Sequence, residues 1–217
     1  MTRAPSLAQP LSTAMREGSA AEHDAAENSG YMTELLNGRV NEAGYAAYLQ
    51  RLHTVYAALE QAVRARLDDA AVTAVYDPAV ERLSAIEVDL EHWAPGAPHG
   101  IESPAAAAYA ARLRGAVSGA ELLAHHYTRY LGDLSGGQAI GRILDRTFDL
   151  DGAGIAFYHF PAIPKPKPYK DAYRARVDAL DFTADDKRRV VEEVKVAFGL
   201  NQALFVELSQ SLADFSR

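Results

Sequence analysis

Residues 124–138 read Ala-His-His-Tyr-Thr-Arg-Tyr-Leu-Gly-Asp-Leu-Ser-Gly-Gly-Gln, and this stretch decides how the rest of the chain is interpreted. Apolar residues recur at helical spacing from Leu122 to Leu134, which predicts an amphipathic helix. Gly132, Gly136 and Gly137 interrupt it, although each costs a helix about 1 kcal/mol relative to alanine. Gly132 and Gly136 share a face. Either a flat, bulky group approaches the backbone there or another helix crosses it closely, and Gly136-Gly137 is a place where the helix can bend.

The composition is that of an ordinary globular protein. The chain has 217 residues, of which 48% are hydrophobic and 24% charged, and its net charge is −7. One domain is the default for this length, and the acidic balance argues against nucleic-acid binding. The absence of cysteine excludes disulfides, iron–sulfur ligation and thiol catalysis. Without a long apolar run or a signal-peptide core, we predict a cytoplasmic protein with no membrane span.

Capping residues and apolar spacing predict a single all-α domain of about eight helices, covering residues 1–217. Residues 1–11 are expected to form a loose lead-in, and residues 93–104 and 149–169 are expected to be loops rich in proline and glycine. The predicted helices include 12–28, 41–67, 82–92, 103–117, the central segment resuming over 139–148, one from about 171, and 183–215 with a bend near Gly199.

Two pairs of polar residues are candidates for a binding site. His23 lies among small residues, and Glu27 follows one turn later on the same face, where its carboxylate could fix the tautomer that a metal ligand requires. Lys170 and Arg174 are also one turn apart, and two neighbouring cations favour binding of an anion. The simpler interpretations are a surface His–Glu pair and a solvated basic face.

The segment Tyr127-Thr-Arg-Tyr-Leu-Gly-Asp-Leu-Ser-Gly-Gly-Gln138 resembles the signature of the heme oxygenase family. Further segments match the family in order and spacing: His23 with Glu27, Ala57-Ala-Leu-Glu60 after Tyr56, Phe157-Tyr-His-Phe160, residues 169–174 and residues 198–205. The resemblance extends over nearly the whole chain. His125-His126 and the missing membrane tail are similar to the soluble bacterial branch. The implied fold holds heme between a proximal and a distal helix.

Carried onto this chain, the resemblance implies that His23 is the axial ligand of the heme iron and that Glu27 holds its imidazole. The backbone of Gly132 and Gly136 would lie close to oxygen on the opposite heme face. Asp133 would anchor a water network, supported by the side chains of Tyr56 and Arg129.

The remaining heme contacts implied by the resemblance fall into two groups. The propionates would be bound by Arg16, Lys170, Arg174 and Tyr127. The pocket would be lined by Met32, Thr128, Gly137, Phe198, Asn201 and Phe205. Arg16 stands where the family commonly has lysine, which keeps the charge but changes its geometry. The prolines of 164–168 suggest a stiff loop nearby, and the other six histidines receive no role, except that His125 is expected behind the distal helix.

The family's reaction implies oxidative cleavage of heme to biliverdin, carbon monoxide and ferrous iron, with the α isomer expected. Heme is both substrate and cofactor, and O2 is consumed. Since the chain has no flavin or dinucleotide motif, an external ferredoxin or flavin reductase must supply electrons to a monomer. A local basic patch with Lys165 and Lys167 could receive that donor.

The alternatives are a heme carrier or sensor without turnover, or another enzyme on this scaffold. A thiaminase-type enzyme would need a cysteine, and a di-iron enzyme would need paired Glu-x-x-His motifs.

Overall fold

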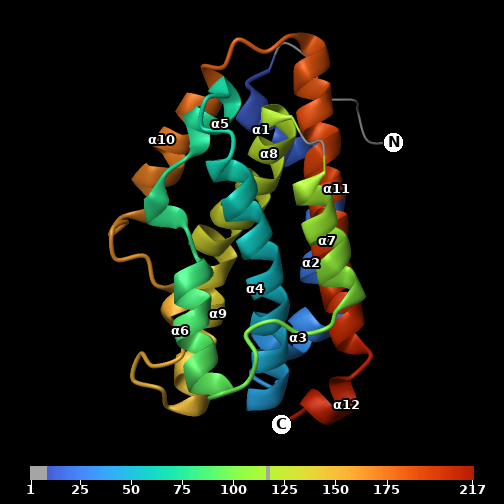
Figure 1. Cartoon of the computed structure of the whole chain (residues 1–217), viewed down its shortest axis with the longest axis vertical. Helices are drawn as coiled ribbons and strands as arrows, with labels where there is room; N and C mark the ends of the chain where they lie inside the picture. Colours follow the sequence, from blue (N-terminus) through green and yellow to red (C-terminus); the bar gives the residue numbers. More distant parts are fainter. Residues whose placement is uncertain (1–8, 116–117) are drawn as a thin grey trace.

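The computed structural model describes residues 9–115 and 118–217, and it folds them almost entirely into helices (Figure 1). Within these ranges the one β-type contact is an isolated bridge between Val40 and Ser216. The predicted all-α fold class is therefore confirmed. In chain order the α-helices are α1 (Leu11–Gly18), α2 (Ala20–Glu27), α3 (Gly30–Leu36), α4 (Glu42–Arg64), α5 (Ala70–Val75), α6 (Leu83–Trp93), α7 (Pro104–Arg114), α8 (Gly119–His126), α9 (Gln138–Phe148), α10 (Pro166–Asp178), α11 (Ala184–Ser209) and α12 (Leu212–Phe215).

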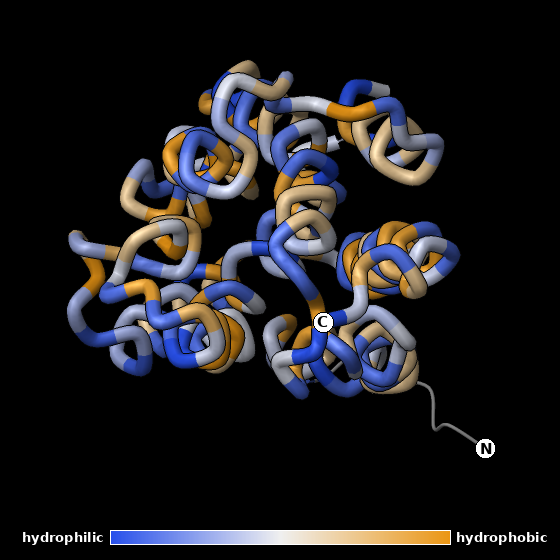
Figure 2. The backbone as a smooth tube through the Cα atoms, turned by 90° about the horizontal axis from the view of Figure 1, so that it is seen from below, coloured by the Kyte–Doolittle hydropathy of each residue, from blue (hydrophilic) through white to orange (hydrophobic). Residues whose placement is uncertain are grey.

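The long helix α4 lies at the centre of the main hydrophobic core, between α6 and α7 (Figure 1). It begins at its predicted cap, where the Asn41 side chain accepts a hydrogen bond of 2.9 Å from the backbone N–H of Gly44. Tyr45, Leu52 and Tyr56 are fully buried along its inner faces. Hydrophobic and hydrophilic positions are interleaved along the helices, as expected for helices that bury one face (Figure 2).

The second long helix, α11, packs against α1, α2 and α8, and a second hydrophobic cluster joins it to α1, α5, α8 and α10. It begins at the predicted capping box, in which the Thr183 hydroxyl accepts from the Asp186 N–H and the Asp186 carboxylate accepts from the Thr183 N–H. Helix α1 approaches it closely, since a Cβ on Gly18 would lie 2.5 Å from Val191 Cγ1. α11 runs without interruption through Gly199, where we expected a bend.

The central segment is one continuous helical run from Gly119 to Phe148. In its middle the hydrogen bonds widen to π-helical turns, η2 (Tyr127–Leu131) and η3 (Asp133–Gly137). Gly132 itself keeps helical angles, with φ −62° and ψ −49°. The glycines therefore lie within a widened helix and do not end it, and such π-turns are frequent at functional sites.

Several helix boundaries differ from the sequence-based prediction. Residues 12–28 form two helices because the chain breaks at Ser19, whose hydroxyl donates to the Met15 carbonyl at 2.7 Å. Ser12 is no cap; its backbone N–H and its hydroxyl donate to the Asp178 carboxylate from inside α1. Leu11 is buried in α1, so the expected lead-in ends before it, and residues 1–8 lie outside the described residues.

Other boundaries shift at the ends of helices. α10 begins at Pro166 rather than near 171, because proline fits the first helical turn, where its N–H is not needed. α5 lies in a region where no helix was predicted and is capped by the Asp69 side chain. α4 ends at Arg64 instead of 67, and α11 ends at Ser209, with α12 separate from it. α7 ends at Arg114, and the predicted extension to Val117 lies outside the described residues.

His125 and His126 are both fully buried. His125 Nε2 lies 2.8 Å from Glu193 Oε1, and Arg112 Nε donates to the same oxygen at 2.8 Å, so α7, α8 and α11 meet at one carboxylate. Burial alone would raise the pKa of Glu193, but these two hydrogen bonds overcome it and lower that pKa to about 2. Burial lowers the pKa of His126 to about 3, so its imidazole is neutral at pH 7.

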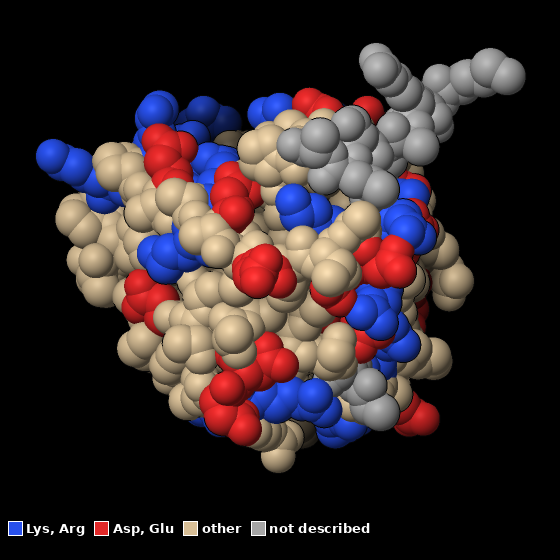
Figure 3. All heavy atoms as spheres, turned by 90° about the horizontal axis from the view of Figure 1, so that it is seen from above, with Lys and Arg blue, Asp and Glu red and all other residues tan. Residues whose placement is uncertain are grey.

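None of the helices described combines the length and the apolar character that crossing a membrane requires. On the surface, basic and acidic side chains are interspersed rather than segregated over the face seen in Figure 3.

Candidate functional site

A cavity of about 570 Å³ opens beside α2, η2 and η3, with α11 contributing part of its wall. That volume lies within the ~300–1,000 Å³ typical of small-molecule sites. Every site residue predicted from the sequence lines it except Tyr56 and Lys170. Its walls include the apolar side chains of Met32, Leu131, Ile140, Phe198 and Phe205. Residues far apart in sequence are thus gathered around one largely apolar space.

His23 reaches this cavity from α2. Its imidazole packs edge-on against Phe198 of α11, with ring centroids 5.4 Å apart, and its side chain remains 48% exposed. Nε2 lies 3.5 Å from Glu27 Oε1, so the predicted His23–Glu27 pair is present. Nδ1 lies 3.7 Å from Asp24 Oδ1, a second carboxylate that the sequence analysis did not consider. One ring nitrogen could bind a metal while the other stays oriented by a carboxylate.

Gly132 and Gly136 line the cavity, and no other part of the chain that the structure describes packs against the side of the backbone where their side chains would be. A Cβ built on either would meet no atom within 4 Å, so the empty space reaches the backbone. A close helix crossing, the simpler interpretation of these glycines, is therefore wrong for this pair. That interpretation applies instead to Gly141, where a Cβ would lie 2.9 Å from Tyr158 Cβ, and to Gly137, where it would lie 3.2 Å from the Tyr158 ring.

Asp133 is the acidic centre of a buried polar network beside the glycines. Its carboxylate accepts a hydrogen bond from the Tyr56 hydroxyl, and Arg129 Nη2 lies 3.7 Å from it. Arg129 Nε donates to the Tyr56 hydroxyl at 3.1 Å, and Arg129 also donates to the Asn201 side chain. Burial raises the pKa of the Asp133 carboxyl, while Arg129 and Tyr56 act in the opposite direction.

Cationic side chains gather at the rim of the cavity. Arg16 and Arg174 line it and are 71% and 41% exposed. Lys170 does not line the cavity itself, but its Nζ donates a hydrogen bond of 2.7 Å to Oγ of Ser135, which does. Partial burial and the nearby Arg174 lower the pKa of Lys170. An apolar space with several cations at its edge suits a flat apolar molecule that carries anionic groups.

Sequence reasoning missed part of the lining. Tyr56 contributes from behind, through Asp133, rather than from the wall. Tyr48 belongs to the predicted tyrosine stripe of α4, and Phe157 and Tyr158 lie in a segment that matched the family, yet neither pattern assigned them to a pocket. The other wall residues not predicted are Ser19, Ala20, Asp24, Ala26, Leu131, Ser135 and Ile140.

Comparison with known proteins assigns the chain and its fold to a family. The family described as heme oxygenase matches residues 9–207. The chain belongs to the heme oxygenase family. Heme oxygenase 1 of Rattus norvegicus is 38% identical over 218 residues, covering 96% of this chain and 75% of the relative. Heme oxygenase 1 of Synechocystis is 35% identical, covering 93% and 86%.

Solved structures of heme oxygenases agree with this assignment. The heme complex of heme oxygenase-1 from the cyanobacterium Synechocystis superimposes with a TM-score of 0.89 at 33% identity, covering 95% of both chains. The heme oxygenase of Leptospira interrogans gives 0.87 at 33% identity, covering 92% of this chain and 100% of that one. The resemblance found in the sequence and the predicted enzyme class, heme oxygenase, are thereby confirmed.

Proposed function

We propose that this chain binds heme in the cavity and opens its ring to biliverdin, carbon monoxide and ferrous iron, using O2 and electrons from an external donor. One observation carries the proposal. The cavity that holds the His23 imidazole also reaches the bare backbone of Gly132 and Gly136. Heme would need an imidazole nitrogen for its iron and free space for oxygen, and a cavity lined by both a histidine and side-chain-free backbone supports the proposal.

In this proposal heme supplies the iron centre at which oxygen is activated, and the chain supplies position and protons. His23 would present one imidazole nitrogen to the iron, while Glu27, near that ring, would restrain its rotation. The missing side chains at 132 and 136 leave room for oxygen beside the iron. Wall residues such as Met32, Phe198 and Phe205 exclude water from the apolar part of the ring.

Asp133 is proposed as the group that passes protons toward the oxygen side of the cavity. Its pKa is raised by burial, which makes its carboxylate a better proton acceptor than an exposed aspartate. Tyr56 and Arg129 hold that carboxylate in place, and Asn201 holds Arg129. Thr128 and Gly137 line the same wall. Tyr56, Arg129 and Asn201 are therefore proposed as positioning residues that act through Asp133.

Arg16, Lys170 and Arg174, with the Tyr127 hydroxyl, are proposed to bind the propionates. A cationic edge fixes how the ring is rotated in its slot, and that rotation decides which meso carbon faces the oxygen. We therefore propose the α isomer of biliverdin as the product.

A ferredoxin or a flavin reductase would donate the electrons, with Lys165 and Lys167 on the docking surface. The chain would act as a cytoplasmic monomer with a single heme-binding domain.

The test is aerobic turnover of the stoichiometric heme complex with a flavin reductase. An oxygenase loses its Soret band, forms biliverdin and releases iron to a chelator, whereas a heme carrier keeps its Soret band.

Asp133→Asn keeps the size of the side chain but removes its negative charge. We expect this variant to bind heme and to form at least tenfold less biliverdin, because general acid–base catalysis contributes about 10²-fold or more. Retention of the Soret band by the wild type would refute the function; an unchanged yield in Asp133→Asn would refute only the proton role.

A further inference from the structure

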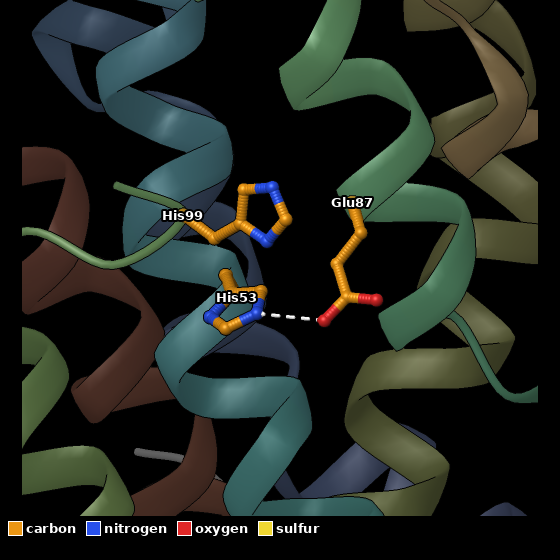
Figure 4. A group of neighbouring side chains, drawn as sticks. All are labelled: His53, Glu87 and His99. Atoms are coloured by element: carbon orange, nitrogen blue, oxygen red, sulfur yellow. Dashed lines mark hydrogen bonds and ion pairs between the residues drawn. The ribbon is translucent and has the colours of Figure 1, made fainter. Parts of the chain in front are cut away.

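A second group of chemically active side chains lies outside the heme cavity. It consists of His53 on α4, Glu87 on α6 and His99 in the segment between α6 and α7, and none of the three lines the cavity (Figure 4). One potential ligand atom from each lies within 4.8 Å of the other two. Three elements thus bring two imidazoles and one carboxylate to a single point.

The distances within this group suit a small cation. His53 Nε2 lies 3.1 Å from Glu87 Oε1, as the dashed line in Figure 4 shows. Ligands of a tetrahedral zinc ion with bonds of ~2.0–2.1 Å are separated by roughly 3.3 Å. Figure 4 also shows the His99 ring beside this pair, with its centroid 5.5 Å from that of His53. A metal would replace the proton that His53 and Glu87 share.

His99 is held in place by contacts outside the group. Its Nε2 lies 3.1 Å from Glu91 Oε1, one turn after Glu87 on α6, which leaves Nδ1 to face a metal. Metal-binding histidines commonly have their second nitrogen bonded to a carboxylate in this way. The backbone beside His99 is fixed as well, because Gln50 Nε2 of α4 donates to the Pro98 carbonyl at 2.9 Å.

We propose that His53, Glu87 and His99 bind one divalent transition-metal ion of the zinc class, with Glu91 orienting His99. Two imidazoles exclude Ca²⁺ and Mg²⁺ as the preferred ions, since these select oxygen ligands. His53 is 21% exposed, Glu87 40% and His99 33%, so an ion can enter and water can complete its coordination. The bound ion joins α4, α6 and the segment that leads to α7, and it has no part in the heme reaction.

Zinc binding to the full chain, measured by equilibrium dialysis and metal analysis, tests this assignment. His23→Ala is measured beside the wild type, because His23 also lies near carboxylates. We expect one zinc ion per chain in both proteins, unaffected by excess Mg²⁺ or Ca²⁺. His53→Ala and His99→Ala should weaken binding more than tenfold, and Glu91→Gln should weaken it about 10- to 100-fold, as loss of an orienting partner does.

The matched control is His159→Ala, which removes an exposed histidine elsewhere. It should bind zinc like the wild type, and zinc should raise its Tm as it raises that of the wild type, while the Tm of His53→Ala should not respond. The assignment is overturned if the wild type takes up no zinc, if His23→Ala alone abolishes uptake, or if His53→Ala and His99→Ala bind like the control. None of these outcomes bears on heme turnover, so the two proposals fail separately.

Discussion

A side chain at position 136 would project into empty space, whereas one at position 141, only five residues on, would collide with Tyr158. Glycine is therefore needed at the two positions for opposite physical reasons. Gly141 allows α9 to pack against Tyr158, which is a matter of folding. Gly136 and Gly132 keep the cavity open down to the backbone, which is a matter of ligand access.

Gly136→Ala should separate stability from activity. Alanine is a better helix former than glycine by up to ~1 kcal/mol, and its methyl group has room. The heme-free variant should therefore unfold at a Tm equal to or above that of the wild type, while biliverdin formation falls because the methyl group occupies the oxygen side. Thermal unfolding and single-turnover spectra measure the two effects.

Gly141→Ala is the matched control for that substitution. Its methyl group would lie 2.9 Å from Tyr158 Cβ, so the variant should lose stability by about 1–3 kcal/mol, as overpacked cores do. A loss of Tm in Gly136→Ala as large as that in Gly141→Ala would contradict the distinction drawn between the two positions.

Residue identity and spacing made His23, Glu27 and the two open glycines candidates, and the resemblance to heme oxygenases gave them their expected roles in the site. Identity and spacing were not enough for contacts made across the fold. The support of Asp133 by Tyr56 was expected only from the family resemblance, because Tyr56 precedes Asp133 by 77 positions and the packing of α4 against the central helix brings its hydroxyl to that carboxylate. Asp24 and Tyr48 were missed, since no local pattern reports which cavity a side chain faces.

At the scale of elements, helix α10 carries two lysines with different surroundings. Lys170 reaches Ser135 on the cavity wall at 2.7 Å, whereas Lys167 is 88% exposed and pairs with Asp171 at 3.1 Å. Lys170→Ala should weaken hemin binding roughly fivefold, because a partly exposed charge pair is worth up to ~1 kcal/mol, and should yield mixed biliverdin isomers. Hemin titration and chromatography of the products are the measurements.

Lys167→Ala, on the same helix, removes an equal charge away from the cavity and should leave both affinity and isomer composition unchanged. If the two variants behave alike, the general charge of α10 matters rather than a contact to the propionates.

The carboxylate that joins α7, α8 and α11 should make stability depend on acid pH. The pKa of Glu193 is about 2 in the folded chain, below its ordinary value of 4.5, so its contribution is complete above pH 4.5 and is lost as the pH falls toward 2. Glu193→Gln should cost roughly 3 kcal/mol of unfolding free energy at pH 7, given ~1.4 kcal/mol per unit of pKa. Urea unfolding across this pH range should show the gap between the proteins closing in acid; a constant gap would exclude the linkage.

Helix existence was largely predictable from caps and apolar spacing, but helix ends were not. Asn41, Ser103 and Thr183 begin their helices as predicted, because a cap is a local hydrogen bond. The break at Ser19 and the start of α10 at Pro166 were not predictable in this way. At Ser19 the hydroxyl donates to the Met15 carbonyl, and at Pro166 the proline occupies the first helical turn. The π-turns of 127–137 have no counterpart in apolar spacing, which describes α-helices.

At the scale of the whole molecule, two hydrophobic clusters are built around α4 and α11, and the cavity takes wall residues from both helices, Tyr48 from one and Phe198 from the other. Composition predicted a globular chain and apolar spacing predicted a helical one, but neither indicated this cavity. The family signature supplied that expectation, and the packing supports it by joining the small-residue helix α2 with the glycine segment around one space.

The proposed function depends on His23 binding the heme iron from one side of this space. Resonance Raman spectroscopy of the ferrous heme complex tests it most directly, because an iron–imidazole bond has its own stretching band. We expect that band in the wild type, its absence in His23→Ala, and its return when imidazole is added to the variant. A His23→Ala complex that keeps the wild-type band without added imidazole would contradict binding through His23.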